Sequence, residues 1–308
     1  IRVLTTSLGD EEFIFGGQRI LEDVLRYAEE EFAPKKIAVV GTCVSMIIGE
    51  DMEAAIESSG ISTPAIAVNI HAGFRENIDG VIAALEPAAA AGWISSEELE
   101  RQRRVLAAAN ATERARGAAC KTYISPSRGD LKHVAATELL SLARSGKRGL
   151  AIMNAKKETA YMFADELLAL HDTVPDADIT YVANLEGRGL PKVRGDAAAI
   201  LAEMCERGVD PVLCGALDEY GENGSAIAEI IAETHPDFVL LVGVPHAVIP
   251  EALQGITVFS VTNGPRQVSP LKEQGHAYVM VEIDLHPKTL GVHEIVESEF
   301  GAVLRSVA

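Results

Sequence analysis

Strand-like and helix-like segments alternate along almost the whole chain, and this alternation limits the possible folds more than any other feature. Short runs rich in Val, Ile and Ala are followed by longer stretches whose apolar residues recur at helical spacing. Such an order favours parallel sheets with right-handed crossovers, so we predict an α/β fold. The predicted strands cover residues 1–6, 36–40, 64–68, 149–153, 179–182, 212–214, 238–242, 258–261 and 278–283.

The predicted elements divide into consecutive Rossmann-like lobes, each a parallel sheet flanked by helices. We expect residues 114–130 to be the segment that crosses from one lobe to the next. The first α/β lobe is therefore expected over residues 1–130. A second α/β region is expected over 131–308, as one lobe or two smaller ones, with the C-terminal helix packing back on it. Because the chain begins with Ile1 inside a strand-like run, we expect a further βα unit upstream in the natural protein. The predicted helices include residues 16–30, 44–58, 78–90, 95–112 and 291–307.

Net charge and cysteine content indicate which binding partners to exclude and which cellular compartment to expect. The formal net charge of −18 repels phosphate backbones and anionic lipid heads, so we expect neither nucleic acid nor a membrane as partner. The four cysteines form no C-x-x-C pair, and the chain shows no signal peptide or long apolar run. Disulfides therefore explain them poorly, and we expect a reducing cytoplasm.

Ligands of parallel α/β sheets bind beyond the carboxyl ends of the strands, and Cys43 lies at such a position. It follows the predicted strand 36–40 and stands where a helix begins. Backbone N–H groups at a helix start favour thiolate, the form that binds iron. Taken alone, a single cysteine in an α/β protein is more often a small core residue, and a 4Fe-4S cluster needs about four ligands. Spacing alone therefore leaves both interpretations of Cys43 open.

Several motifs together resemble component 1 of the nitrogenase-like reductases. That family has an acidic residue before Phe-Gly-Gly, a cysteine at a strand end and an Ile-Gly-Asp-Asp-type helix; here the acidic pair is Glu50-Asp51. Within the family, the set is most similar to the reductive cyclases of nickel-tetrapyrrole biosynthesis in methanogenic archaea. The motifs are Asp10-Glu-Glu-Phe-Ile-Phe-Gly-Gly, Gly41-Thr-Cys-Val-Ser-Met-Ile-Ile-Gly-Glu-Asp, Gly215-Ala-Leu-Asp-Glu-Tyr, Gly243-Val-Pro-His, Thr262-Asn-Gly-Pro-Arg and Glu297-Ser-Glu-Phe-Gly.

The resemblance implies a nitrogenase component 1-like fold and the catalytic component of an ATP-dependent reductive cyclase. Such an enzyme reduces a nickel sirohydrochlorin diamide and closes a lactam ring. Cys43 matches a cluster ligand of the family, which implies a 4Fe-4S cluster bridging the two subunits of a homodimer. An ATP-dependent iron–sulfur reductase would supply the electrons. This chain is expected to bind no nucleotide itself, and its sequence contains neither a Walker A motif nor a dinucleotide fingerprint.

A carboxylate-rich macrocycle needs cations and hydrogen-bond donors in its pocket. Arg266, after the predicted strand 258–261, can pair with a propionate in bidentate geometry. His246, after the strand 238–242, can donate a proton near neutral pH, and Asp218 is a second candidate acid. His71 and Arg75 follow the strand 64–68 in the same way. Each of these residues is also explained as a helix cap or a surface loop residue.

The remaining candidates favour structural roles, and other functions stay open. We expect Cys205 to pack inside a helix and Cys214 to lie in the core, and we assign no mechanism to Cys120. The alternatives are another nitrogenase-like tetrapyrrole reductase, a cofactor-scaffold subunit, and a binding relative that has lost its cluster. The histidines expected at the surface are His276, His286 and His293.

Overall fold

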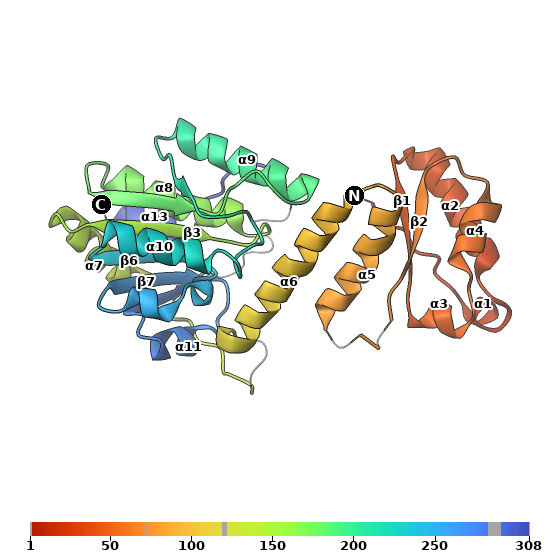
Figure 1. The fold of residues 1–308 in the computed structure, drawn as a ribbon, viewed down its shortest axis with the longest axis horizontal. Helices are drawn as coiled ribbons and strands as arrows, with labels where there is room; N and C mark the ends of the chain where they lie inside the picture. Colours follow the sequence, from red (N-terminus) through yellow and green to blue (C-terminus); the bar gives the residue numbers. More distant parts are fainter. Residues whose placement is uncertain (1, 72, 75, 119–121, 283–290, 308) are drawn as a thin grey trace. The chain divides into compact units, whose positions relative to one another are not determined.

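The computed structural model describes residues 2–71, 73–74, 76–118, 122–282 and 291–307, and it divides into two compact units. Unit 1 is Ile1–Arg103 and unit 2 is Arg104–Ala308, with the boundary inside helix α6 (Ser96–Arg116). Each unit has its own parallel sheet (Figure 1). Each also has its own apolar core. The domain boundary at residue 130 stays a prediction.

Unit 1 contains a two-stranded parallel sheet, β1 (Ile37–Gly41) and β2 (Ala65–Asn69), whose register places Ile37 opposite Ala65. Its core joins Leu21 and Leu25 of one helix to Val39 of β1 and to Met52 of another helix. The helices of this unit are α1 (Asp10–Phe15), α2 (Gln18–Phe32), α3 (Cys43–Ile47), α4 (Met52–Ser59), α5 (Asn77–Ala90) and the first part of α6.

Unit 2 is built on a six-stranded, fully parallel sheet with the order β5-β4-β3-β6-β7-β8. The order reverses at β3, so the carboxyl ends of β3 and β6 flank the switch point where ligands of such sheets bind (Figure 1). The strands are β3 (Gly149–Asn154), β4 (Ile179–Ala183), β5 (Val212–Leu213), β6 (Phe238–Gly243), β7 (Thr257–Thr262) and β8 (Tyr278–Val281).

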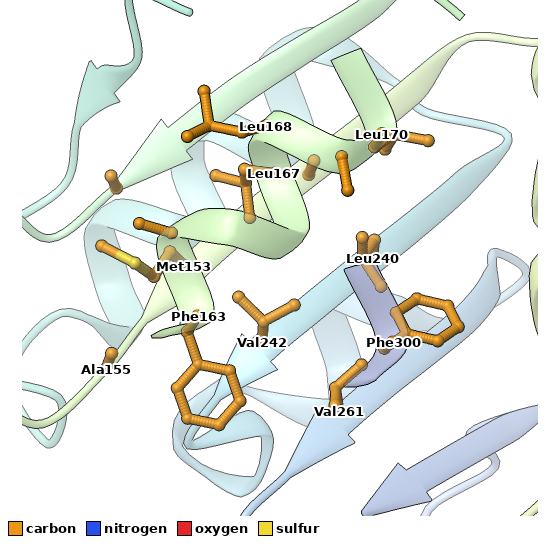
Figure 2. Packing of buried hydrophobic residues seen from close by; sticks show 14 of the residues in the cluster. Met153, Ala155, Phe163, Leu167, Leu168, Leu170, Leu240, Val242, Val261 and Phe300 are labelled. Carbon is orange, nitrogen blue, oxygen red and sulfur yellow. The ribbon is translucent and has the colours of Figure 1, made fainter. Parts of the chain in front are cut away.

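Both faces of this sheet are covered, because successive side chains of a strand point to opposite faces. Along β3, Ala151 and Met153 join one core cluster while Leu150 and Ile152 join the other. Figure 2 shows the first cluster at close range, where side chains of the sheet meet α8 and α13. That face carries α7 (Lys132–Arg144), α8 (Ala160–Thr173), α9 (Pro191–Glu206) and α13 (Glu299–Ser306), and the other carries α10 (Gly224–Thr234).

Two local predictions in unit 1 are wrong, and each has a physical reason. The helix predicted over 44–58 is two helices, because Gly49 takes a left-handed φ of 73° after α3 and Asp51 then caps α4. Residues 2–6 have strand-forming side chains but pair with no strand in the described part of the chain. No described helix is both long and apolar enough to span a bilayer.

Candidate functional site

Cys43 is the first residue of α3, directly after β1 and the N-cap Thr42. Its side chain is half-buried. The turn before it is tightly held: Ser45 Oγ accepts a hydrogen bond from Thr42 N and donates to Thr42 O, both at 2.9 Å. A Cβ on Gly41 would lie 2.6 Å from the end of Met52, so glycine lets α4 pack under this turn. The position of Cys43 is therefore set by both the strand end and the packing beneath it.

Two motifs of unit 1 contact each other through Gly17. This glycine is buried, and a Cβ there would lie 2.2 Å from Glu50 Oε1. Glu50 Oε1 is buried and has no hydrogen-bond partner among the described residues. Its neighbour Asp51 has a separate task, since its Oδ1 accepts from Ala54 N at 2.9 Å and caps α4. The acidic pair of the motif thus divides into a helix cap and a carboxylate held against Phe-Gly-Gly.

Large apolar side chains on α3 and α1 are exposed. Val44, Met46 and Ile47, next to Cys43, are 40%, 50% and 77% exposed. The three consecutive residues Phe13, Ile14 and Phe15 of α1 are also exposed. Grouped exposure of this kind is typical of surfaces that another protein covers.

The described part of the chain offers a single cysteine ligand in unit 1. Cys43 is the one cysteine described there, and the described residues contain no group of three or more His, Cys, Asp or Glu placed to hold a metal ion. Cys120 lies outside the described residues. Since a 4Fe-4S cluster takes about four ligands, Cys43 and the other described residues do not by themselves make up a ligand set.

In unit 2, polar side chains meet at the carboxyl ends of the strands around one carboxylate oxygen, Glu113 Oε1. His246 follows β6 in the short helix η1 (Pro245–Ala247), and its Nε2 lies 3.3 Å from that oxygen. Tyr220 OH donates to it at 3.4 Å, and Lys156 Nζ lies 3.8 Å from it. Lys156 also lies over the Tyr220 ring, 4.9 Å from its centre. The structure therefore places His246 in a cluster with Tyr220, which belongs to the Asp218-Glu-Tyr motif, and with Glu113 and Lys156, two residues that sequence reasoning missed.

Electrostatics in this cluster favour an ionised Glu113. Burial alone raises the pKa of its carboxyl, but the hydrogen-bonding and charge of His246, with the charge of Lys156, outweigh burial and hold that pKa below its ordinary value. Burial, together with the Glu113 charge, raises the pKa of Tyr220. At neutral pH the cluster therefore holds an ionised carboxylate beside a protonated phenol.

Side-chain amides tie together the loops that carry this cluster. Asn184, after β4, accepts from Ala155 N at 3.0 Å and donates to Ala155 O at 2.9 Å. Asn223 donates to Asn154 Oδ1 at 3.0 Å, and Asn154 donates to Tyr220 O at 3.3 Å. All three amides are buried, so these hydrogen bonds are both necessary and stabilising. The loops after β3, β4 and β5 are consequently held as one frame.

The other predicted site residues lie in different surroundings. Asp218 has a φ of 68° and its Oδ1 accepts from Lys157 N at 2.8 Å, while burial raises its pKa above the ordinary value. Arg266 is exposed, with its guanidinium 5.0 Å from the centre of the Tyr123 ring. His71 is half-buried in unit 1, and its Nδ1 accepts from Gly73 N at 3.0 Å. Arg75 lies outside the described residues.

Two of the structural predictions for Cys and His are wrong. Cys205 is exposed rather than packed, with its Sγ 3.8 Å from Asp210 Oδ1. His276 is buried rather than at the surface: its Nδ1 lies 2.6 Å from Ser260 Oγ, and burial lowers its pKa to about 4. Cys214 does lie in the core, where burial raises its pKa to about 12. His293 is exposed as predicted, and His286 lies outside the described residues.

Comparison with known proteins decides the family. A family model described as nitrogenase component 1 type oxidoreductase matches residues 1–103, the range of unit 1. The Ni-sirohydrochlorin a,c-diamide reductive cyclase complex component CfbD of Methanosarcina acetivorans is 49% identical over 100% of this chain and 85% of that protein. The same component of Methanothermobacter thermautotrophicus is 45% identical over 99% of this chain and 86% of that protein.

The chain belongs to the CfbD family of nitrogenase component 1 type oxidoreductases. The resemblance inferred from the motifs is confirmed, and with it a nitrogenase component 1 type of α/β fold and the class of oxidoreductase component. CfbD of Methanocaldococcus jannaschii is 36% identical over 99% of this chain and 86% of that protein.

Two solved nitrogenase Cp1 structures also align with the CfbD-family chain, at 15% and 14% identity. They cover 89% and 98% of this chain, and 41% and 66% of their own, with TM-scores of 0.26 and 0.29. Likeness at these scores adds nothing to the assignment, which is carried by the sequence relatives.

Proposed function

We propose that this chain is the catalytic component of a reductive cyclase that reduces a nickel sirohydrochlorin diamide and closes a lactam ring. The observation that carries the proposal is identity of 36–49% to three CfbD components over 99–100% of the chain. This identity spans unit 2 as well as unit 1, whereas the general family model matches residues 1–103 alone. The proposal therefore rests on likeness across both units.

The partners in this proposal are a second copy of the chain and an ATP-dependent iron–sulfur reductase. The names of the relatives describe them as components of a complex, which supports a need for other subunits. The exposed apolar residues Val44, Met46 and Ile47 on α3 support coverage of the Cys43 face by a second copy. We place the protein in the cytoplasm, with no nucleotide bound by this chain.

Cys43 in this proposal supplies one thiolate to a 4Fe-4S cluster that two copies share. Its half-buried position at the start of α3 supports this role, because the thiol is reachable from outside its own unit. Two copies bring two such thiolates, related by a two-fold axis. When bound, the cluster accepts and passes single electrons.

The substrate contacts in this proposal come from residues after the strands. His246 donates a proton to the macrocycle, with Asp218 as the second acid on the same edge of the sheet. Arg266, exposed beside Tyr123, pairs with a carboxylate of the macrocycle, and His71 and Arg75 make further contacts. These residues supply binding and protons, while the reductase supplies the electrons.

Anaerobic reconstitution of Cys43→Ala tests the cluster. We expect the wild-type protein to gain visible iron–sulfur absorbance and the variant to lose it, together with ATP-dependent conversion of the nickel substrate. Cys205→Ala is the matched control, because this exposed cysteine of unit 2 should leave both unchanged. Full absorbance in Cys43→Ala would refute the role of Cys43. Absence of conversion by a cluster-loaded wild type with its reductase would refute the proposed function itself.

A further inference from the structure

Glu113 is placed to control the orientation of His246. The carboxylate reaches the imidazole ring at Nε2, 3.3 Å from Glu113 Oε1. One helical turn further along α6, the Arg116 guanidinium holds the backbone of the same residue, donating to His246 O at 2.7 Å and to Ala247 O at 3.1 Å. Both the ring and the main chain of His246 are therefore fixed by one helix.

The end of α6 is itself anchored at the same edge of the sheet. Gln267, which follows β7, donates from Nε2 to Arg116 O at 2.9 Å and accepts from Ala118 N at 2.9 Å. Gly221 lets its loop pack closely against α6, since a Cβ there would lie 2.7 Å from the backbone of Ala108. The carboxylate of Glu113 thus belongs to a helix that is held in place on either side of it.

The chemistry of the contact selects one tautomer of His246. A carboxylate only accepts hydrogen bonds, so the imidazole nitrogen that faces ionised Glu113 must carry the hydrogen. That nitrogen is Nε2, which leaves Nδ1 as the nitrogen available to another group. His246 is 7% exposed, and both ring nitrogens are buried without a well-aligned hydrogen bond among the described residues. Nε2 has the Glu113 carboxylate 3.3 Å away, whereas no such contact is found for Nδ1 in that part of the chain. A buried polar atom without a partner costs about 1–3 kcal/mol and is typical of a place where a ligand completes the bonding.

We propose that Glu113 is a positioning residue that holds Nε2–H of His246 toward itself, so that Nδ1 is the nitrogen that serves the substrate, directly or through one water. This inference rests on the proposed function. In the protonated ring, the Nδ1–H bond breaks as a C–H bond forms at a macrocycle carbon that has gained electrons from the iron–sulfur reductase. The ring is left neutral with its hydrogen on Nε2, the tautomer that Glu113 stabilises.

Nitrogen NMR of protein labelled with ¹⁵N-histidine tests the tautomer without any turnover. The His246 signals are assigned by their loss in His246→Gln. In the wild type we expect the shifts of an Nε2–H imidazole, and in Glu113→Gln we expect a shift toward mixed tautomers. Glu113→Asp keeps the charge and should keep the Nε2–H signature. Glu100→Gln is the matched control on the same helix, where an exposed carboxylate pairs with Arg103.

Turnover by the complete enzyme tests the consequence. We expect kcat of Glu113→Gln to fall about 10²-fold, the scale of a misplaced acid, with KM nearly unchanged. Glu113→Asp should recover part of the rate, and Glu100→Gln should equal the wild type. Unaltered His246 signals in a folded Glu113→Gln would overturn the inference, and so would altered signals with an unaltered kcat. Failure of the proposed function would instead appear as a wild type that never turns over, with the tautomer result still readable.

Discussion

At the scale of single residues, the candidate site of unit 2 depends on a glycine at the end of a strand. Gly243 ends β6 with a φ of 102°, and a Cβ there would lie 2.6 Å from Asn154 O and 2.9 Å from Ala155 Cα. Both atoms are backbone of the neighbouring strand end, so they cannot swing away. This close approach brings the His246 loop against the end of β3.

Gly243→Ala should therefore lose more stability than left-handed backbone strain alone explains. We expect a loss of about 2–4 kcal/mol in the free energy of unfolding, from strain plus the backbone clash. The matched control is Gly255→Ala, at φ 79° with no atom within 4 Å, which should cost about 1–2 kcal/mol. Urea unfolding monitored by circular dichroism measures both. Equal losses of unfolding free energy in the two variants would show that the close approach at Gly243 does not affect stability.

At the scale of elements, α8 is buried along most of its length and carries two carboxylates into the core of unit 2. Asp165 is fully paired there: it accepts from Ser298 N at 2.8 Å and from Arg305 at 2.7 Å, which holds α13 against α8. Glu166 is 0% exposed, and neither of its carboxylate oxygens has a hydrogen-bond partner in the described part of the chain. The two adjacent carboxylates therefore differ in their hydrogen bonding.

Burial, and then the nearby charges of Glu282 and Asp165, raise the pKa of Glu166 well above its ordinary value, with Lys132 offsetting part of this effect. The folded protein thus keeps a proton on Glu166 that the unfolded chain releases above the ordinary value of 4.5. The contribution of Glu166 to the free energy of unfolding is therefore fully present below pH 4.5. It is lost progressively as the pH rises toward the raised pKa. Glu166 consequently weakens the fold at neutral pH.

Glu166→Gln should stabilise the protein increasingly as the pH rises. A neutral amide of the same shape loses no proton, so the gain over the wild type should grow between pH 4 and 8 by up to about 1.4 kcal/mol per pH unit. Urea unfolding at pH 4, 6 and 8 measures the difference. Glu229→Gln, at an exposed position on α10, should show no such trend. A gain in Glu166→Gln that is the same at all three pH values would contradict the prediction.

At the scale of the whole molecule, charge repulsion should dominate the response to salt. The chain has 45 acidic against 27 basic side chains and a formal net charge of −18, which opposes both compaction and the pairing of two copies. Screening reaches about 30 Å in 0.01 M salt and about 3 Å in 1 M salt. Added salt should therefore weaken the long-range repulsion between negative charges, both within the folded chain and between two copies of it.

We expect NaCl to raise the urea midpoint of unfolding and the dimer fraction in sedimentation equilibrium. Between about 0.01 M and 1 M NaCl, the free energy of unfolding should rise by about 1 kcal/mol or more. A variant with six exposed carboxylates changed to amides, away from α1 and α3, should respond less. A midpoint that falls with salt in the wild type would indicate that ion pairs, rather than net repulsion, dominate.

Some of the candidate site followed from local patterns, and some did not. The place of His246 after an apolar strand predicts it as a site residue, and the structure puts it at the switch point beside β3. Glu113 was not predicted, because on α6 it is one of many charged residues with nothing local to distinguish it. Its contact Tyr220 lies 107 residues away in the sequence, so only folding brings the two together. The buried state of Glu166 escaped prediction for the same reason.

The sequence by itself determined the α/β class, the parallel strands of unit 2 and the family. Each depends on short-range information: apolar runs of strand length, helical spacing and motifs such as Gly-Thr-Cys. Only the tertiary structure decided that His246, Tyr220 and Lys156 meet around Glu113, that His276 is buried and that the 44–58 segment breaks into two helices. Burial, pairing and pKa depend on which distant segments pack together, and local spacing does not encode those distances.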